Sequence, residues 1–226
     1  MTCCNSAWGW SREPRPPPGR AERLRKRHPL PPPEAFIFDL DGTLTIPQLD
    51  FVVIRREMGI AAGPILEELE LLDDEAAARA RKVLEKHEEQ AATTAVLQQG
   101  AREVLAELRR RGLPTSILTR NSRQSLDTVL QLHRLEIDTS LSREEAPVKP
   151  SPEAVLILCD KMNVAPVKTY VIGDYIFDIE SARNAGAVSV LLLNSKNSMF
   201  SEQADLKIAN LMEILDFPNQ SREKTA

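Results

Sequence analysis

The stretch Phe36-Ile37-Phe38-Asp39-Leu40-Asp41-Gly42-Thr43-Leu44-Thr45 joins an apolar run to two carboxylates that are one residue apart. The continuous apolar run from Ala35 to Phe38 predicts a strand that is buried on both faces, as in parallel sheets. Acidic residues at the carboxyl end of such a strand lie where open α/β sheets place their ligands. Gly42 permits a sharp turn that brings backbone N–H groups close to a bound group. The stretch therefore predicts a ligand site at the end of the first strand.

The length and composition limit the classes of protein that need to be considered. At 226 residues, 42% hydrophobic and 27% charged, the chain has room for one medium core and a small attached unit. No run reaches the ~18 apolar residues of a membrane span, so we expect no membrane partner. The three cysteines offer neither a disulfide framework nor a zinc spacing, which favours a reducing, cytoplasmic location.

Charge is unevenly distributed along the chain. Residues 1–33 carry seven Lys or Arg and two Glu, hence +5; because the whole chain carries −4, the remainder carries −9. A body that binds nucleic acid is expected to be basic, so we expect no nucleic-acid partner. The sequence indicates no particular oligomeric state.

Both ends of the chain are predicted to be flexible. Residues 1–33 contain eight of the sixteen prolines and few aliphatic residues, a composition that cannot bury a core. The segment is rich in Arg and poor in acids, so a transit peptide for a chloroplast or mitochondrion is an alternative, although it has few serines and much proline. Residues 217–226 form a second expected tail.

Strands alternate with helices over most of the remaining chain. After the first strand we predict strands at 114–119, 139–141, 169–173 and 187–193, with helices at 101–111, 122–133, 153–162 and 179–186 and a closing helix at 209–215. This alternation predicts an α/β fold with a doubly wound parallel sheet, built from residues 34–45 and 99–216. Residues 46–98 interrupt the pattern with helices expected at 49–58, 65–72 and 76–93, and no strand signal. We expect them to form a small helical insertion.

Polar residues follow each of the later strands that could reach the first site. These are Thr119, Lys149 in Val-Lys-Pro-Ser-Pro, and Asp174 with Asp178 in Gly173-Asp174-Tyr175-Ile176-Phe177-Asp178. Each has a plain structural alternative: a turn residue for Thr119, a solvated charge for Lys149 and helix caps for the two aspartates. Their order along the chain, each after a strand or at a helix start, favours a common site.

These motifs together closely resemble those of the haloacid dehalogenase-like (HAD) phosphohydrolases. Asp39-x-Asp41-Gly42-Thr43 is similar to the first signature of that family, Thr119 to the second, Lys149 to the third, and Asp174 with Asp178 to the fourth. The resemblance covers about residues 35–215. It implies a Rossmann-like HAD core whose insertion at 46–98 is a helical cap that closes over the site, as in phosphoglycolate phosphatase-like members.

The resemblance also assigns roles to these residues. Asp39 would be the nucleophile that forms an aspartyl-phosphate, and Asp41 would ligate metal through its carbonyl while its side chain acts as acid and base. Carboxylates that converge on a phosphorylated substrate repel one another, and Mg²⁺ resolves this conflict. The expected metal residues are Asp39, Asp41, Asp174 and Asp178; Lys149 is catalytic; and the substrate-binding candidates are Gly42, Thr43, Thr119, Arg120 and Asn121.

Two departures from the family pattern concern the substrate pocket. Arg120 stands where phosphoglycolate phosphatase-like members often have Asn, and Asn121 follows one residue later. Arg120 is either an additional phosphate or carboxylate contact or an outward-facing charge. Tyr175 replaces a frequent Ser or Thr.

The sequence favours a Mg²⁺-dependent phosphatase that acts on a small phosphorylated metabolite. Asp41 argues for phosphoryl transfer over dehalogenation, which requires no acid for the leaving group. The alternatives are a phosphomutase of the same superfamily and a catalytically silent binding or regulatory module.

Overall fold

The first predicted strand is strand β1, Ala35–Phe38, and all four of its residues are buried. The structure is a computed structural model that describes residues 30–218. The other strands are β2 (Thr115–Leu118), β3 (Thr139–Leu141), β4 (Thr169–Gly173), β5 (Val188–Leu192) and β6 (Leu206–Ile208).

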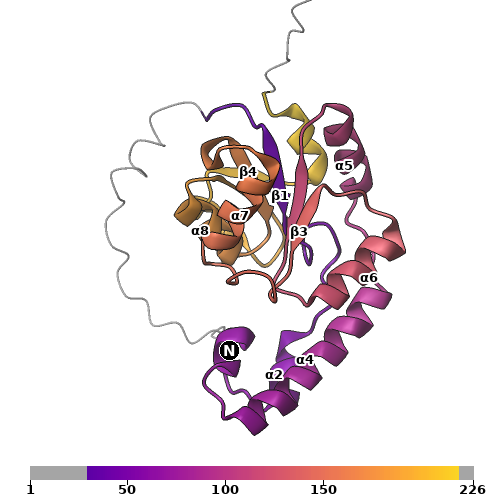
Figure 1. Ribbon diagram of the computed structural model, residues 1–226, viewed down its shortest axis with the longest axis vertical. Helices are drawn as coiled ribbons and strands as arrows, with labels where there is room; N and C mark the ends of the chain where they lie inside the picture. The colour runs from indigo at the N-terminus through magenta and orange to yellow at the C-terminus, as the bar shows by residue number, and fades with distance from the viewer. Residues whose placement is uncertain (1–29, 219–226) are drawn as a thin grey trace, which may run out of the picture. The chain divides into compact units, whose positions relative to one another are not determined.

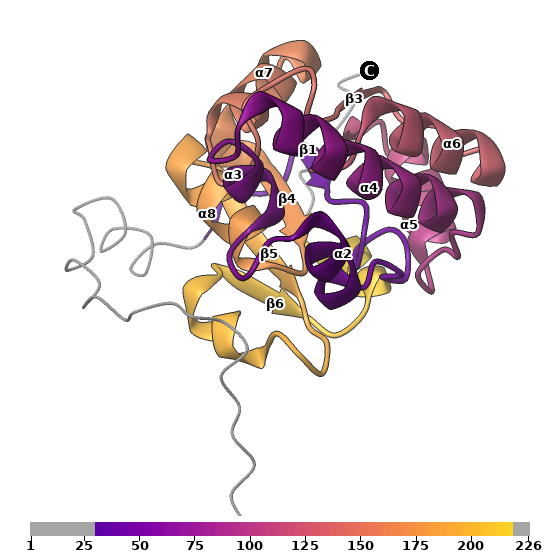
Figure 2. The same cartoon turned by 90° about the horizontal axis from the view of Figure 1, so that it is seen from below.

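The six strands form one parallel sheet in the order β3-β2-β1-β4-β5-β6, which can be followed in Figure 2. The chain moves outward from β1 to β3 and then returns to the other side of β1 with β4. The strand order therefore reverses between β1 and β4, and ligands of open α/β sheets bind at such a point. The α/β fold with a parallel sheet is confirmed.

Helices cover both faces of this sheet (Figure 1). One face carries α5 (Ala101–Arg110), α6 (Arg123–His133) and the 3₁₀ helix η3 (Leu211–Asp216), and the other carries α7 (Glu153–Met162) and α8 (Ile176–Ala185). Alternate residues of β1 point to opposite faces: Phe36 and Phe38 belong to the first hydrophobic cluster, and Ile37 belongs to the second. Because both faces are covered, the strands read as continuous apolar runs.

Five elements differ from the sequence prediction. Strand β6 was not predicted, because it has three residues and Lys207 in its middle is exposed. The predicted closing helix is the 3₁₀ helix η3, and the 3₁₀ helices η1 (Pro166–Lys168) and η2 (Ser198–Gln203) were not expected. Helix α8 begins at Ile176, so Asp178 lies in its first turn rather than in a loop.

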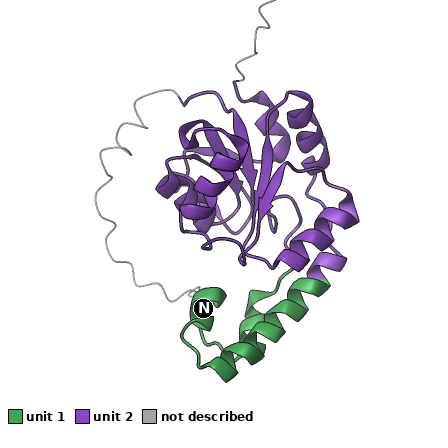
Figure 3. Cartoon of the chain, in the orientation of Figure 1, with its two compact units in different colours: residues 1–29, 49–90 green, residues 30–48, 91–226 purple. Residues whose placement is uncertain are grey.

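The described residues divide into two compact units, residues 49–90 and residues 30–48 with 91–218 (Figure 3). The smaller unit holds α2 (Phe51–Met58), α3 (Ile65–Leu69) and most of α4 (Asp74–Thr93). Asp50 caps α2 by accepting hydrogen bonds from Val52 and Val53 N, and Asp73 accepts one from Ala76 N at 2.8 Å. The unit has a small hydrophobic cluster of its own, which consists of Ile54, Ile65, Leu69, Ala80 and Leu84.

Two paired segments of the larger unit lead into and out of the insertion. Ile46 N donates to Val96 O at 2.9 Å, Gln98 N donates to Leu44 O at 2.9 Å, and a β-bridge joins Thr45 to Leu97. We call these paired segments, residues 44–48 and 94–98, the stem. The stem begins three residues after Asp41.

The packed core extends beyond the boundaries expected from the sequence at both ends. Leu30 packs against the first hydrophobic cluster, and the Tyr170 hydroxyl donates to Pro31 O at 2.8 Å. The Phe217 ring lies 5.5 Å from the Tyr170 ring, centroid to centroid. The remaining residues of the two expected tails, 1–29 and 219–226, lie outside the described part of the chain. Among residues 30–218, no helix is both long and apolar enough to cross a membrane.

Candidate active site

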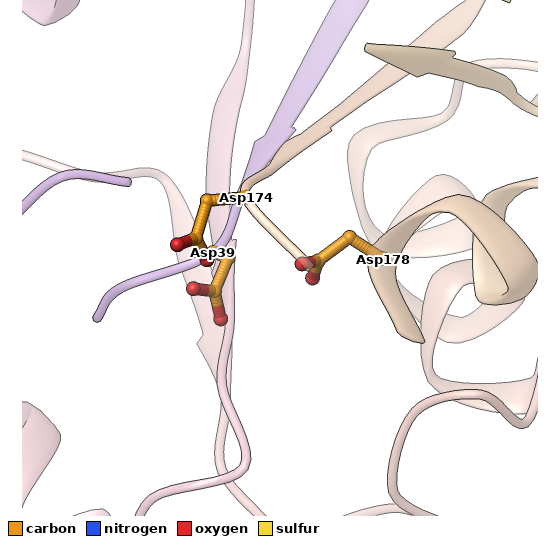
Figure 4. A group of neighbouring side chains, drawn as sticks. All are labelled: Asp39, Asp174 and Asp178. Carbon is orange, nitrogen blue, oxygen red and sulfur yellow. The ribbon is translucent and has the colours of Figure 1, made fainter. Parts of the chain in front are cut away.

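Three aspartates meet at the point where the strand order reverses. Asp39 follows β1, Asp174 follows β4, and Asp178 lies in the first turn of α8. Their side chains point toward one another in Figure 4, and one carboxylate oxygen from each lies within 4.8 Å of the others. As expected for parallel strands, which present their carboxyl ends at one edge of the sheet, three of the four residues predicted to bind metal lie together there; their role stays a prediction.

Two glycines make room for these carboxylates. A Cβ atom on Gly42, whose φ is +85°, would lie 2.4 Å from Asp174 Oδ2, and one on Gly173 would lie 2.0 Å from Asp178 Cγ. Both distances are far below van der Waals contact. The glycines of the two motifs are therefore needed because the carboxylates pack directly against the backbone.

Lys149 bridges two of the three carboxylates. Its Nζ donates to Asp39 Oδ1 at 2.5 Å, to Asp178 Oδ1 at 2.6 Å and to Leu118 O at 2.9 Å. The side chain is only 3% exposed, and these contacts use all three of its donors. Lys149 is thus a buried part of the site and not a solvated surface charge.

The site holds more negative than positive charge. Burial raises the pKa of Asp39 well above its usual value; Lys149 opposes this rise, and repulsion from Asp178 and Asp174 adds to it. Burial and repulsion from Asp178 raise the pKa of Asp174 to about 7. Burial lowers the pKa of Lys149, but the attraction of Asp178 and Asp39 is stronger, so its pKa lies above the usual value. One ammonium group faces three carboxylates, and that imbalance favours a bound cation.

Asp41 lies apart from the three-carboxylate group and has its own partners. Its Oδ2 accepts a hydrogen bond from Asn121 Nδ2 at 2.7 Å, and its Oδ1 accepts one from Thr45 Oγ1 at 3.2 Å. Burial raises the pKa of Asp41, although both hydrogen bonds oppose the rise. The predicted contact of its backbone carbonyl with a metal stays a prediction.

The other predicted substrate-binding residues have different environments. Thr119 is buried, and its Oγ1 accepts a hydrogen bond from Asn121 N at 3.1 Å. The Arg120 guanidinium lies 4.5 Å from the centroid of the Phe177 ring and donates to Lys149 O, so it is not an outward-facing charge. Thr43 is fully buried, and its hydroxyl has no hydrogen-bond partner among the described residues.

Sequence reasoning missed two asparagines that contact Asp174. Asn194 Nδ2 donates to Asp174 Oδ2 at 3.1 Å, and Asn197 Nδ2 donates to Asp174 O at 2.8 Å. Asn197 Oδ1 in turn accepts from Asn194 N at 2.9 Å. The signal was present, because Asn194 follows the fifth strand as Asp174 follows the fourth. An asparagine in a loop, however, is so common that it indicates little alone.

The donor set fits a hard divalent cation. Three carboxylates within reach of one another supply the oxygen ligands that such ions prefer, and a charge of +2 would offset the excess that one lysine leaves. The described chain can therefore hold a metal ion through Asp39, Asp174 and Asp178. Lys149 places a cation beside the same carboxylates and could neutralise a second anion there.

Known proteins are similar to this chain in sequence and in fold. A sequence model described as haloacid dehalogenase-like hydrolase matches residues 46–192. The chain is 30% identical over 205 residues to an uncharacterized hydrolase of Saccharomyces cerevisiae, covering 84% of this chain and 93% of that relative. It is 26% identical over 211 residues to an N-acetylmuramic acid 6-phosphate phosphatase of Pseudomonas aeruginosa, covering 81% and 93%. A solved putative phosphoglycolate phosphatase of Lactobacillus plantarum has a similar fold, with a TM-score of 0.66, 23% identity and coverage of 82% and 99%.

Proposed function

The chain belongs to the haloacid dehalogenase-like hydrolase family, and we propose that this enzyme is a Mg²⁺-dependent phosphatase that hydrolyses a small phosphorylated metabolite through an aspartyl-phosphate. The observation that carries the proposal is the group formed by Asp39, Asp174 and Asp178 with Lys149 buried between two of them. A nucleophilic carboxylate, a cation site and a fixed ammonium group are the parts that phosphoryl transfer requires.

The proposed reaction has two steps. An Asp39 carboxylate oxygen attacks phosphorus, the bond from phosphorus to the leaving oxygen breaks, and Asp41 gives its proton to that oxygen. Water then attacks the phosphorus of the aspartyl-phosphate and passes a proton to Asp41. The bond between Asp39 and phosphorus breaks, releasing phosphate and restoring both aspartates.

The remaining residues position and neutralise. Thr119 would hold a transferring oxygen, and Lys149 would do so by exchanging one of its three contacts for it. The Thr43 hydroxyl, which has no partner among the described residues, is a further polar group in the turn that contains Gly42. Asp39, Asp174 and Asp178 would hold Mg²⁺, with the carbonyl of Asp41 as the predicted fourth protein ligand. When bound, Mg²⁺ supplies positive charge that offsets the negative charge of the carboxylates and the phosphoryl group.

Phosphoryl transfer is favoured over dehalogenation because Asp41 is positioned by hydrogen bonds and can act as a general acid for the leaving group. Two hydrogen bonds hold the carboxyl group of Asp41, which lies two residues after the proposed nucleophile, and dehalogenation has no use for such a group. Water is the default acceptor, which favours a phosphatase over a phosphomutase.

We further propose that the insertion at 46–98 acts as a cap that selects the leaving group. The residues named above address only the phosphoryl group, which all phosphomonoesters share. The stem begins three residues after Asp41, so only a short segment of the chain separates the insertion from the site. A sugar-phosphate substrate is consistent with the name of the P. aeruginosa relative, N-acetylmuramic acid 6-phosphate phosphatase, and a phosphoglycolate-type substrate is the other candidate from the sequence.

The test is a panel of phosphomonoesters, including p-nitrophenyl phosphate, phosphoglycolate and sugar phosphates, assayed with Mg²⁺ and with EDTA. We expect phosphate release that requires Mg²⁺ and differs among substrates. Transfer of the phosphoryl group to a second substrate hydroxyl would identify a mutase instead. Binding of a phosphorylated compound without any turnover would identify a silent module.

A further inference from the structure

Asn121 contacts Asp41 from a segment of the chain that is 80 residues away in the sequence. We infer that Asn121 is a positioning residue that holds the Asp41 carboxyl group in the orientation it needs to protonate the leaving group. The inference rests on the proposed function and gives Asn121, which the sequence suggested as a substrate-binding residue, a different role.

The backbone of Asn121 is fixed on both sides. Its N–H donates to Thr119 Oγ1 at 3.1 Å, and its carbonyl accepts from Arg143 N at 3.2 Å. The next residue, Ser122, caps α6 by accepting a hydrogen bond from Ser125 N at 3.2 Å. The Asn121 side chain therefore projects from a rigid segment between a buried strand and a capped helix, which is where a positioning group is most effective.

Of the two contacts to the Asp41 carboxylate, the one from Asn121 is the stronger. The Asn121 amide approaches Oδ2 to 2.7 Å, whereas the Thr45 hydroxyl lies 3.2 Å from Oδ1. The Thr45 hydroxyl also lies 3.1 Å from Leu40 O, and its single proton can serve only one of the two oxygens. Without Asn121, the carboxyl group would keep only this shared contact and could rotate about its χ2 angle.

Loss of that orientation impairs both proton transfers by Asp41, but kcat/KM reports only the steps up to the departure of the leaving group, and it is there that the two substrates differ. An alkoxide is a strong base and leaves phosphorus well only when Asp41 delivers its proton as the P–O bond breaks. A p-nitrophenolate is a weak base and leaves without this proton. A misplaced Asp41 must therefore slow the cleavage of an alkyl phosphate more than that of an aryl phosphate, whereas a fold defect would slow both by the same factor.

The experiment compares kcat/KM for p-nitrophenyl phosphate and for the best alkyl phosphate of the panel, with Mg²⁺, in three variants. Asn121→Ala removes the amide. Asn121→Asp keeps its size and replaces the donor with an acceptor. Asn210→Ala is the matched control, because it removes an asparagine side chain that caps η3 by accepting from Met212 N at 3.1 Å and so produces a purely structural loss.

We expect both Asn121 variants to lower the ratio of alkyl to aryl kcat/KM by about tenfold or more, and Asn210→Ala to leave this ratio unchanged. Loss through kcat with a nearly constant KM would further support positioning. An equal loss on both substrates, no loss on either, or a larger loss on the aryl phosphate would overturn the inference while leaving the phosphatase intact. A wild-type enzyme that releases phosphate from neither substrate would overturn the proposed function, and the inference with it.

Discussion

At the scale of single residues, the site is governed by one ammonium group among three carboxylates. Lys149 contacts Asp39 and Asp178. The Asp174 carboxylate instead accepts a hydrogen bond from the Asn194 amide and packs against the backbone of Gly42. Asp174 makes no ion pair within residues 30–218, and burial together with repulsion from Asp178 raises its pKa to about 7. In the absence of a metal, Asp174 is thus a source of instability that the proposed function requires.

This imbalance predicts that Asp174→Asn stabilises the metal-free protein. The folded-state pKa of about 7 lies above the ordinary value of 3.8, so the neutral carboxyl group is favoured in the fold. Its contribution to stability is complete below about pH 4 and is lost as the pH rises through 7. In EDTA at pH 8, we expect the variant to unfold at a higher temperature than wild type, with a free energy of unfolding greater by on the order of 2–4 kcal/mol.

Below about pH 4 the difference between the two proteins should largely disappear, because the carboxyl group of wild-type Asp174 is then neutral in the unfolded as well as in the folded protein. Added Mg²⁺ should raise the melting temperature of wild type at pH 8 and leave that of the variant nearly unchanged. Equal responses of the two proteins to Mg²⁺ would show that Asp174 is not a metal ligand.

The nucleophile can be tested with a substitution of equal size. Asp39→Asn removes the charge that attacks phosphorus and one oxygen of the three-carboxylate group, so phosphatase activity should fall below detection. Wild type given Mg²⁺ and beryllofluoride should be inhibited, because the adduct imitates an aspartyl-phosphate. Substantial turnover by the variant would contradict covalent catalysis.

At the scale of secondary structure, apolar runs identified the sheet and the site edge well. Strands β1, β3 and β4 lie within the predicted bounds, and the likeness to HAD phosphohydrolases is confirmed by the family match. The reason is that buried parallel strands and their polar ends are local signals, carried by adjacent residues. Contacts between distant segments carry no such signal, and so the bond from Asn121 to Asp41 and the bonds of Asn194 and Asn197 were not predicted.

Edge elements were harder to predict for a related reason. Strand β6 pairs with a neighbour on one side only, as Val190 to Leu206 and Leu192 to Ile208, and its middle residue Lys207 faces solvent. An edge strand needs few apolar residues, so its sequence is not distinct from that of a loop. Helix α8 was placed too late because Tyr175 begins it with a capping box to Asp178, and tyrosine is not a usual cap residue.

The turn from β4 to α8 predicts that Gly173 cannot be replaced by alanine without loss of the site. Gly173→Ala would place a Cβ atom 2.0 Å from Asp178 Cγ, so the carboxylate must move away from Lys149. We expect a loss of stability of about 3 kcal/mol, because a buried ion pair loses one partner, and a loss of the rise in melting temperature caused by Mg²⁺.

Gly59→Ala is the matched control. Gly59 has a φ of +75° and no atom within 4 Å of an added Cβ, so this substitution costs only backbone strain of about 1 kcal/mol. It should leave the response to Mg²⁺ intact. If Gly173→Ala behaved like Gly59→Ala, the contact between the β4 end and Asp178 would not be needed for the site.

At the scale of the whole molecule, the chain contains separate hydrophobic cores. Two clusters cover the faces of the sheet, and a third of five buried residues lies within residues 49–90. Within this smaller unit, the His87 Nε2 atom lies 2.9 Å from Glu57 Oε2, and Arg55 and Arg56 lie in the last turn of α2, where cations favour the helix dipole. His87 therefore has a partner within the smaller unit, and the two arginines have a structural role at the end of α2.

Because residues 49–90 have a hydrophobic cluster of their own, we predict that their removal changes substrate preference without abolishing catalysis. If residues 49–90 are replaced by a Gly-Ser linker, the sheet, its two clusters and the stem remain, so turnover of p-nitrophenyl phosphate should persist. The ranking among alkyl phosphates should flatten, with the preferred substrate losing about ten- to a hundredfold in kcat/KM. A ranking that survived the replacement would show that the insertion does not select substrates. Arg55→Ala and Arg56→Ala should each affect the best alkyl phosphate more than p-nitrophenyl phosphate if these arginines contact the leaving group.

The stem has a consequence for how such a gene can change over generations. The bonds between Gln48 and Thr94 involve side chains. Two others, Ile46 N to Val96 O and Gln98 N to Leu44 O, join backbone atoms, and backbone bonds form whatever the neighbouring side chains are. Recombination or drift between codons 49 and 90 can therefore lengthen, shorten or exchange the inserted segment without disturbing the junction at which it leaves the sheet. Selection can then act on that segment and on the aspartates independently, so that descendants inherit the same chemistry with new preferences.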